Sequence, residues 1–142
     1  MSSLSSPPTT PTPPLDSSAL DSSTTMFCVL LRSGHETPMA LKQALDFGIA
    51  AAAFGHKAHL VVSDQGIDFF MENGLSVCDN ASHIRALLSQ LPLFDLAPIW
   101  ICENSLDQQN RTLDDMHIEH IQVLTSLALN RLIAPPHHTL IF

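Results

Sequence analysis

Residues 26–66, MFCVLLRSGHETPMALKQALDFGIAAAAFGHKAHLVVSDQG, carry the pattern that decides the fold. The run from Met26 to Ser33 is apolar and rich in strand formers, as is typical of a strand covered on both faces. From Met39 to Phe54 small and apolar residues recur at helical spacing, and Gly55 is placed to end a helix. Lys57 to Gly66 reads as a second strand. Because small residues let a helix lie close against a sheet, this unit predicts a crossover between parallel strands.

The same alternation continues through the rest of the chain. Short helical segments are predicted at 67–74, 82–91 and 126–133, strands at 97–104, 117–125 and 138–142, and a polar turn or short helix at 105–111. Strands that alternate with helices are typical of an α/β sandwich. The sequence therefore predicts five strands in a mainly parallel sheet.

The first 25 residues differ in composition from everything that follows. They are almost entirely Ser, Thr and Pro, with no aromatic and no basic residue. Such a segment has too little apolar surface to offset the entropy lost on ordering. We therefore expect a disordered tail at 1–25 and a single α/β domain at 26–142. The tail lacks the features of a secretory signal, and no apolar run is long enough for a membrane span, so we expect a soluble cytoplasmic protein without membrane contact.

Charge and cysteine content limit the classes of function. The chain has a formal net charge of −8 and only six Lys and Arg residues, which lie singly. This argues against direct nucleic-acid binding and favours protein partners. The three cysteines, Cys28, Cys78 and Cys102, are too few and too widely spaced for a disulfide framework or a zinc site, which predicts free thiols.

The carboxyl ends of parallel strands are where ligands and reactive groups gather in such sheets. Three segments should meet there, namely 33–37, 63–66 and 102–108. Cys102 lies at or just past the end of the third strand, where its thiol can meet a docked molecule. It is the main candidate functional residue of the sequence.

Three quoted segments carry a resemblance to a known family. FGHKAHLVVSDQG at 54–66, LPLFDLAPIWICENSL at 91–106 and HTLIF at 138–142 resemble the DsrE/DsrF-like sulfur-relay proteins, most closely the TusC (DsrF) branch. The resemblance implies a flavodoxin-like (DsrEFH-like) three-layer sandwich. It also implies a subunit of a homo- or hetero-oligomer that passes sulfur on as persulfide, in bacteria toward tRNA 2-thiouridine or in sulfur oxidation.

The resemblance points in two directions for Cys102. Cys102 matches the position of the carrier cysteine in TusD/DsrE-type subunits, whereas TusC-type subunits are regarded as supporting partners. The family usually has an arginine-rich turn after the Ser105-Leu106 pair, and this chain has DQQN at 107–110 instead. We therefore expect an accessory subunit with Cys102 as the candidate persulfide carrier and no cofactor. The implied partners are DsrE-, TusB- or TusD-like subunits and a persulfide donor protein.

Other residues have weaker cases. His35, in the first strand-to-helix loop, could reach the rim of Cys102 and accept a proton, but a turn histidine without a catalytic role is the simpler interpretation. His117 and His120 suggest a metal, yet in a strand they would point to opposite faces. Cys28 should be core, and Cys78 an incidental thiol exposed in a loop.

A function of another class stays open from sequence. A stand-alone α/β module could use the carboxyl rim of the sheet to bind a small ligand or a regulatory protein without catalysis. A metal-dependent enzyme is a third hypothesis. The chain has no G-x-G-x-x-G and no P-loop, so nothing indicates a nucleotide or flavin site.

Overall fold

The computed structural model describes residues 26–135 and 137–142. Five strands form one sheet in the order β4-β3-β2-β1-β5, and every neighbouring pair is parallel. The strands are β1 (Met26–Leu31), β2 (Lys57–Val62), β3 (Ile99–Cys102), β4 (Ile121–Leu124) and β5 (His138–Ile141). The predicted five-stranded α/β architecture is confirmed, and the sheet is wholly parallel.

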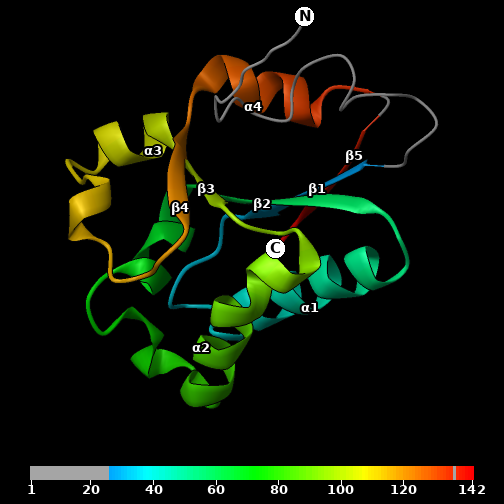
Figure 1. Cartoon of the computed structure of the whole chain (residues 1–142). Helices are drawn as coiled ribbons and strands as arrows, with labels where there is room; N and C mark the ends of the chain where they lie inside the picture. Colours follow the sequence, from blue (N-terminus) through cyan, green and yellow to red (C-terminus); the bar gives the residue numbers. More distant parts are fainter. Residues whose placement is uncertain (1–25, 136) are drawn as a thin grey trace, which may run out of the picture.

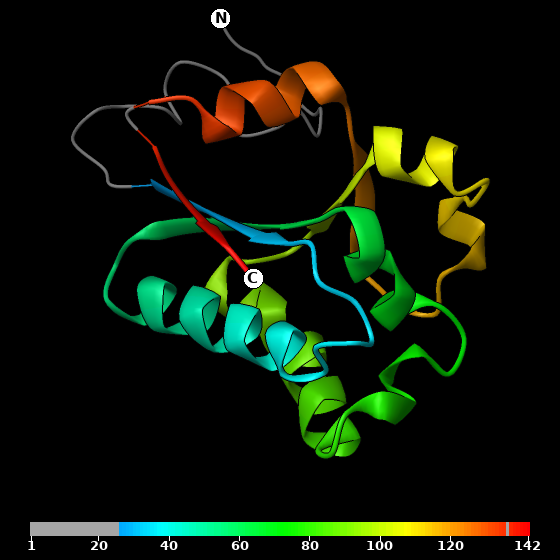
Figure 2. The ribbon, with the colours of Figure 1, turned by 180° about the vertical axis from the view of Figure 1, so that it is seen from behind.

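Helices cover both faces of this sheet. They are α1 (Met39–Ala53), α2 (Ala81–Gln90), α3 (Glu103–Gln108) and α4 (Ser126–Ile133). Four 3₁₀ turns connect them, η2 (Asp64–Phe70), η3 (Gly74–Val77), η4 (Leu91–Phe94) and η5 (Leu113–Asp115). Figures 1 and 2 show α1 and α2 on one face, α4 on the other, and α3 beside the sheet near β3 and β4.

Alternation along β3 divides the core into two layers. Ile99 and Ile101 belong to the larger cluster, which packs under α1 and α2, whereas Trp100 belongs to a smaller cluster under α4. Successive side chains of a strand point to opposite faces, which is why one short strand serves both clusters. Cys102 follows the same alternation and therefore lies on the α4 side.

The ends of α1 follow the sequence signals. Pro38 directly precedes the helix, and its backbone is already helical with φ −60° and ψ −24°. The helix ends before Gly55, which has φ +85°. That conformation is strained for side chains with a Cβ, so glycine is suited to turning the chain into β2.

Two predicted elements differ from the observed ones. The short helix predicted at 67–74 is replaced by the 3₁₀ turns η2 and η3, and the strand predicted at 117–125 is limited to β4. His117 instead donates its backbone N–H to the Phe70 carbonyl at 3.0 Å, beside a single antiparallel bridge between Met71 and Met116. This segment binds the η2 region, so it does not extend β4.

No helix among the described residues has the length and apolar character needed to cross a membrane. The predicted tail at 1–25 lies outside the described residues.

Candidate functional site at the carboxyl edge of the sheet

Cys102 is the last residue of β3 and the N-cap of α3. Its backbone is extended, with φ −63° and ψ 120°, and it stands in register with Leu124 of β4. The residue is only 5 % exposed. The sequence thus placed this thiol at the correct end of the strand, but the residue is buried.

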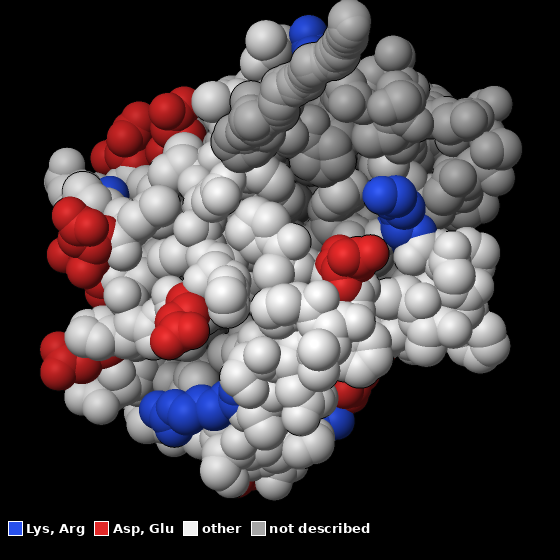
Figure 3. All heavy atoms as spheres, viewed as in Figure 1, with Lys and Arg blue, Asp and Glu red and all other residues white. Residues whose placement is uncertain are grey.

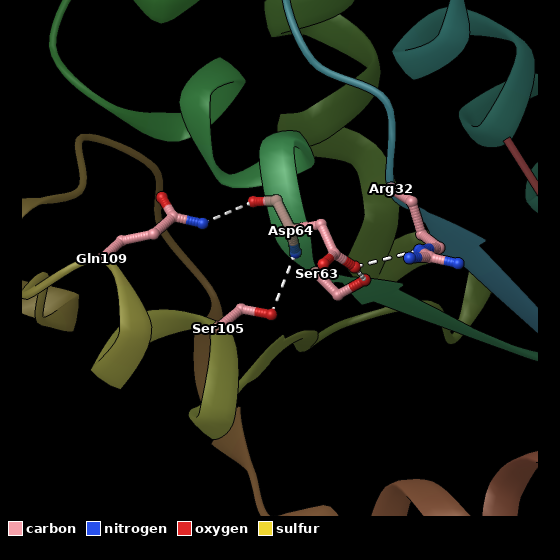
Figure 4. A network of polar contacts seen from close by, with 5 residues as sticks. All are labelled: Arg32, Ser63, Asp64, Ser105 and Gln109. Carbon is pink, nitrogen blue, oxygen red and sulfur yellow. Dashed lines mark hydrogen bonds and ion pairs between the residues drawn. The ribbon is translucent and has the colours of Figure 1, made fainter.

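The Asp64 backbone attaches α3 to the end of β2. Its N–H donates a hydrogen bond to Ser105 Oγ at 3.0 Å, and its carbonyl accepts one from Gln109 Nε2 at 2.8 Å (Figure 4). Asp64 has φ +53°, a left-handed conformation that Asp tolerates better than most residues. The segment containing Cys102 is therefore joined to the loop after β2 through main-chain groups.

The Asp64 carboxylate extends this network to β1. Its Oδ2 accepts hydrogen bonds from Ser63 Oγ at 2.8 Å and from Arg32 Nε at 3.0 Å (Figure 4). The Arg32 and Asp64 side chains are 53 % and 42 % exposed, so solvent screens the ion pair and its stabilisation is modest. The structure brings together the ends of β1, β2 and β3, as the sequence predicted for this edge.

His35 has a different set of contacts. Its Nε2 lies 3.0 Å from the Gly74 carbonyl, which can only accept, so the contact is a hydrogen bond when Nε2 carries the proton. The ring also packs edge-on against Phe69, with the centroids 5.3 Å apart. None of the hydrogen bonds within the described ranges joins His35 to Cys102. His35 therefore links η3 to the loop between β1 and α1.

The surface of α3 and η5 is acidic. Four exposed carboxylates belong to these two elements, those of Glu103, Asp107, Asp114 and Asp115. Figure 3 shows acidic side chains spread over the side of the molecule where α3 lies in Figure 1. Such a surface repels polyanions and suits a basic protein partner.

Arg111, which follows the DQQN turn, is engaged inside the fold. Its Nη1 donates to Asp68 Oδ1 at 2.7 Å, and both side chains are partly buried. The backbone N–H of Arg111 also donates to the Leu106 carbonyl at 3.0 Å. This arginine therefore holds α3 against η2 rather than facing a ligand beside Cys102.

The other two thiols are buried. Cys28 is 1 % exposed within the sheet, where burial raises its pKa to about 12. The expectation of an exposed thiol at Cys78 is wrong, because this residue is 7 % exposed and its Sγ lies 3.7 Å from the Pro38 carbonyl. Burial, with a smaller effect of Asp79, raises the pKa of Cys78.

The histidines suggested as metal ligands lie in the loop before β4. His117 and His120 are exposed, and His120 Nε2 lies 3.8 Å from the carboxylate of its neighbour Glu119. Among the described residues no group of three or more His, Cys, Asp or Glu side chains is arranged to hold a metal ion.

Sequence reasoning identified the segments of this edge but missed its central residue. The sequence around Asp64 does not indicate its partners, because Ser105 and Gln109 lie 41 and 45 positions further along the chain. The local signal was the Asp-x-Gly at 64–66, which indicates a turn but not its partners.

Comparison with known proteins identifies a family and a fold. Residues 26–142 match the DsrE/DsrF-like family. The structure is similar to the crystal structure of the YchN protein from E. coli, with a TM-score of 0.63 and 14 % sequence identity over 84 % of this chain and 99 % of that one. At that identity the likeness shows the fold alone, which is the DsrE flavodoxin-like fold. No curated protein sequence matches the chain significantly.

Proposed function

This chain belongs to the DsrE/DsrF-like family, and we propose that it is a TusC-like (DsrF-like) supporting subunit of an intracellular sulfur-relay complex. The family is generally associated with sulfur relay, and its members generally form complexes with related subunits. The observation that carries the proposal is the 5 % exposure of Cys102. The end product of the relay that we propose is tRNA 2-thiouridine.

Sulfur transfer requires a reachable thiolate. A carrier thiolate attacks the terminal sulfur of a donor persulfide, so that one S–S bond forms, the donor S–S bond breaks, and the donor leaves as a thiolate. Cys102 is buried, and the helix that begins after it is held by hydrogen bonds from Asp64 and Gln109 and by the Arg111–Asp68 ion pair. These contacts support a scaffold whose partner subunit carries the sulfur.

The partners that we propose are TusB-like and TusD-like subunits, with a persulfide donor protein that docks on the assembly. The exposed carboxylates beside α3 favour a basic surface on whichever partner covers this edge.

Co-purification and relay activity test the supporting role. We expect the chain to co-purify with TusB-like and TusD-like subunits, and the complex with Cys102→Ser to retain its rate of sulfur transfer. A stable monomer that captures neither subunit contradicts the proposal. A complex that forms normally but loses sulfur transfer with Cys102→Ser contradicts the scaffold role and favours the second candidate.

That second candidate is a carrier role for Cys102 itself, favoured by its position at the carboxyl end of β3. In this case the Cys102 thiolate takes the terminal sulfur of the donor and becomes a persulfide. Incubation with a cysteine desulfurase and cysteine, followed by intact-mass measurement, tests it. A carrier gains one sulfur in the wild type and in Cys78→Ser but not in Cys102→Ser, whereas a scaffold gains none in all three.

A further inference from the structure

A cavity of about 430 Å³ opens at the other end of the sheet from Cys102. It is bordered by the first residues of β2, by the turn between α1 and β2, and by the residues that lead into β3. Its volume falls within the range of roughly 300–1,000 Å³ that small-molecule sites occupy. Nothing in the sulfur-relay proposal uses this part of the molecule.

Two opposite charges border this cavity. Lys57 begins β2 and Asp95 precedes β3, and both residues are exposed. The four ion pairs found among the described residues involve neither of them. In a chain with a formal net charge of −8, this border thus offers one cation and one anion. A molecule that carries both charges satisfies both groups, whereas a simple anion leaves Asp95 facing a like charge.

A neutral histidine contributes to the same cavity. His59 is part of its wall, but within the described part of the chain its Nε2 is buried without a hydrogen-bond partner, so this atom is not exposed in the cavity. Burial, then the charges of Lys57 and His137, lower the pKa of His59 to about 4, so the ring is neutral near pH 7. His59 therefore adds no charge to the cavity wall near pH 7.

Apolar residues form part of the remaining wall. Trp100, Phe94 and Leu96 supply apolar surface. Two turn residues, Gly55 and Asp95, have left-handed backbones with φ +85° and φ +60°. These turns fix where Lys57 and Asp95 stand relative to the apolar wall.

We propose that this cavity binds a free α-amino acid with an apolar side chain. The carboxylate of the ligand pairs with Lys57, its ammonium group pairs with Asp95, and its side chain lies against Trp100. This site is independent of Cys102, so its failure and the failure of the sulfur-relay role are separate results.

Trp100 provides the measurement, because it is the only tryptophan in the chain. The full-length protein is titrated with L-leucine, L-methionine and L-phenylalanine while Trp100 fluorescence is followed. Acetate and methylammonium serve as probes that carry one charge each, and N-acetyl-L-leucine amide as a probe that carries neither. We expect saturable binding of at least one amino acid and no saturable response to the other three probes.

Charge-removing variants with matched controls assign the contacts. Lys57→Gln and Asp95→Asn should each weaken binding by about tenfold or more, as expected for loss of a charged partner. Lys42→Gln and Asp46→Asn remove the same charges from an ion pair on α1, and should leave binding unchanged. Absence of binding by all three amino acids overturns the proposal. Equal binding of acetate, or equal weakening by the α1 controls, overturns it as well.

Discussion

Asp64 shows how one residue can join three strand ends. Its backbone holds α3, and its carboxylate receives hydrogen bonds from Ser63 and Arg32. Asp64 makes both sets of contacts with a left-handed backbone. Gly66 follows two residues later in the same turn, η2. The position of the edge next to Cys102 therefore depends on close main-chain packing after β2.

Gly66→Ala tests that packing. A Cβ at this position would lie 2.5 Å from the Leu31 carbonyl oxygen, and a backbone atom cannot move aside as a side chain can. We expect a loss of about 1–3 kcal/mol in the free energy of unfolding, as for other overpacked sites. Gly48→Ala, where the nearest atom is the flexible Leu60 Cδ2 at 3.2 Å, is the control and should change it by less than about 1 kcal/mol. Urea denaturation measures both, and equal losses contradict the packing argument.

His59 makes the stability of the fold depend on pH. Its folded-state pKa of about 4 lies below the ordinary 6.5, so between these values the unfolded chain binds more protons. The contribution of neutral His59 to the free energy of unfolding is complete above pH 6.5 and is lost as the pH falls toward 4. The loss should be on the order of 2 kcal/mol. His59→Gln should lack this part of the pH dependence, and the exposed His117→Gln should keep it, in urea denaturation at pH 7 and pH 4.5. Equal slopes for wild type and His59→Gln contradict the assignment.

Thiol labelling tests the burial of the cysteines. The three thiols are 1 %, 7 % and 5 % exposed at Cys28, Cys78 and Cys102. We expect all three to react slowly with a thiol reagent such as DTNB in the folded protein and rapidly in guanidinium chloride. Peptide mapping identifies any exception, and rapid labelling of Cys102 in the folded chain contradicts the burial on which the supporting role is based.

Burial of single cysteines is what the sequence predicted least well. Cys28 lies inside an apolar run, so its burial followed from the pattern. Cys78 lies in a polar segment, and its burial depends on the Pro38 loop 40 positions earlier. Contacts between distant loops leave no periodic signal in the sequence. The position of Cys102 along its strand was therefore predictable, whereas its burial was not.

α3 illustrates how a short element depends on its contacts. It spans six residues, and isolated helices of that length are unstable in water. Its position comes from the hydrogen bonds of Ser105 and Gln109 to Asp64, and from the Arg111–Asp68 ion pair at its far end. Changes at these contacts should therefore affect α3 before they affect the longer α1.

Ser105→Ala removes one such contact. Ser105 is 5 % exposed, and its loss leaves the Asp64 N–H without its acceptor, which should lower the free energy of unfolding by about 1–3 kcal/mol. Hydrogen exchange should accelerate in α3 and η2 more than in α1. The control is Ser76→Ala, whose hydroxyl makes an exposed hydrogen bond, and it should change stability by less than about 0.5 kcal/mol. Uniform acceleration across all elements contradicts the local role.

At the level of elements the sequence was most informative where periodicity was strong. The helix predicted from 39 to 54 is observed as Met39–Ala53, and the helix predicted at 126–133 is α4. The strand predicted at 117–125 retained only Ile121–Leu124. The first residue of the predicted strand, His117, donates its backbone N–H to the Phe70 carbonyl instead. A sequence pattern does not show which of two possible partners a segment pairs with.

The whole molecule combines two unequal apolar layers on one parallel sheet. The layer beneath α1 and α2 is the larger, and the layer beneath α4 contains Cys28, Trp100 and Leu132. The alternation of strands and helices predicted this architecture. The strand order did not follow from the sequence, because an apolar run carries no information about its neighbour.

Residues 26–142 should account for the stability of the chain. From the Ser, Thr and Pro content of residues 1–25 we propose that they add no apolar burial to the fold. Deletion of residues 2–25 should change the free energy of unfolding by less than about 0.5 kcal/mol. Thermal and urea unfolding of the full-length and shortened chains compare the two, and a loss of several kcal/mol contradicts the proposed division.

The position of β5 also bears on how the chain is made. β1, the first of the described strands in chain order, lies between β2 and β5, and its residues Phe27 to Leu30 are paired with β5. While the ribosome is still translating, that side of β1 has no neighbour until residues 138–141 have left the exit tunnel. Until then the nascent chain exposes this edge of β1, and an exposed strand edge is the kind of surface that chaperones recognise.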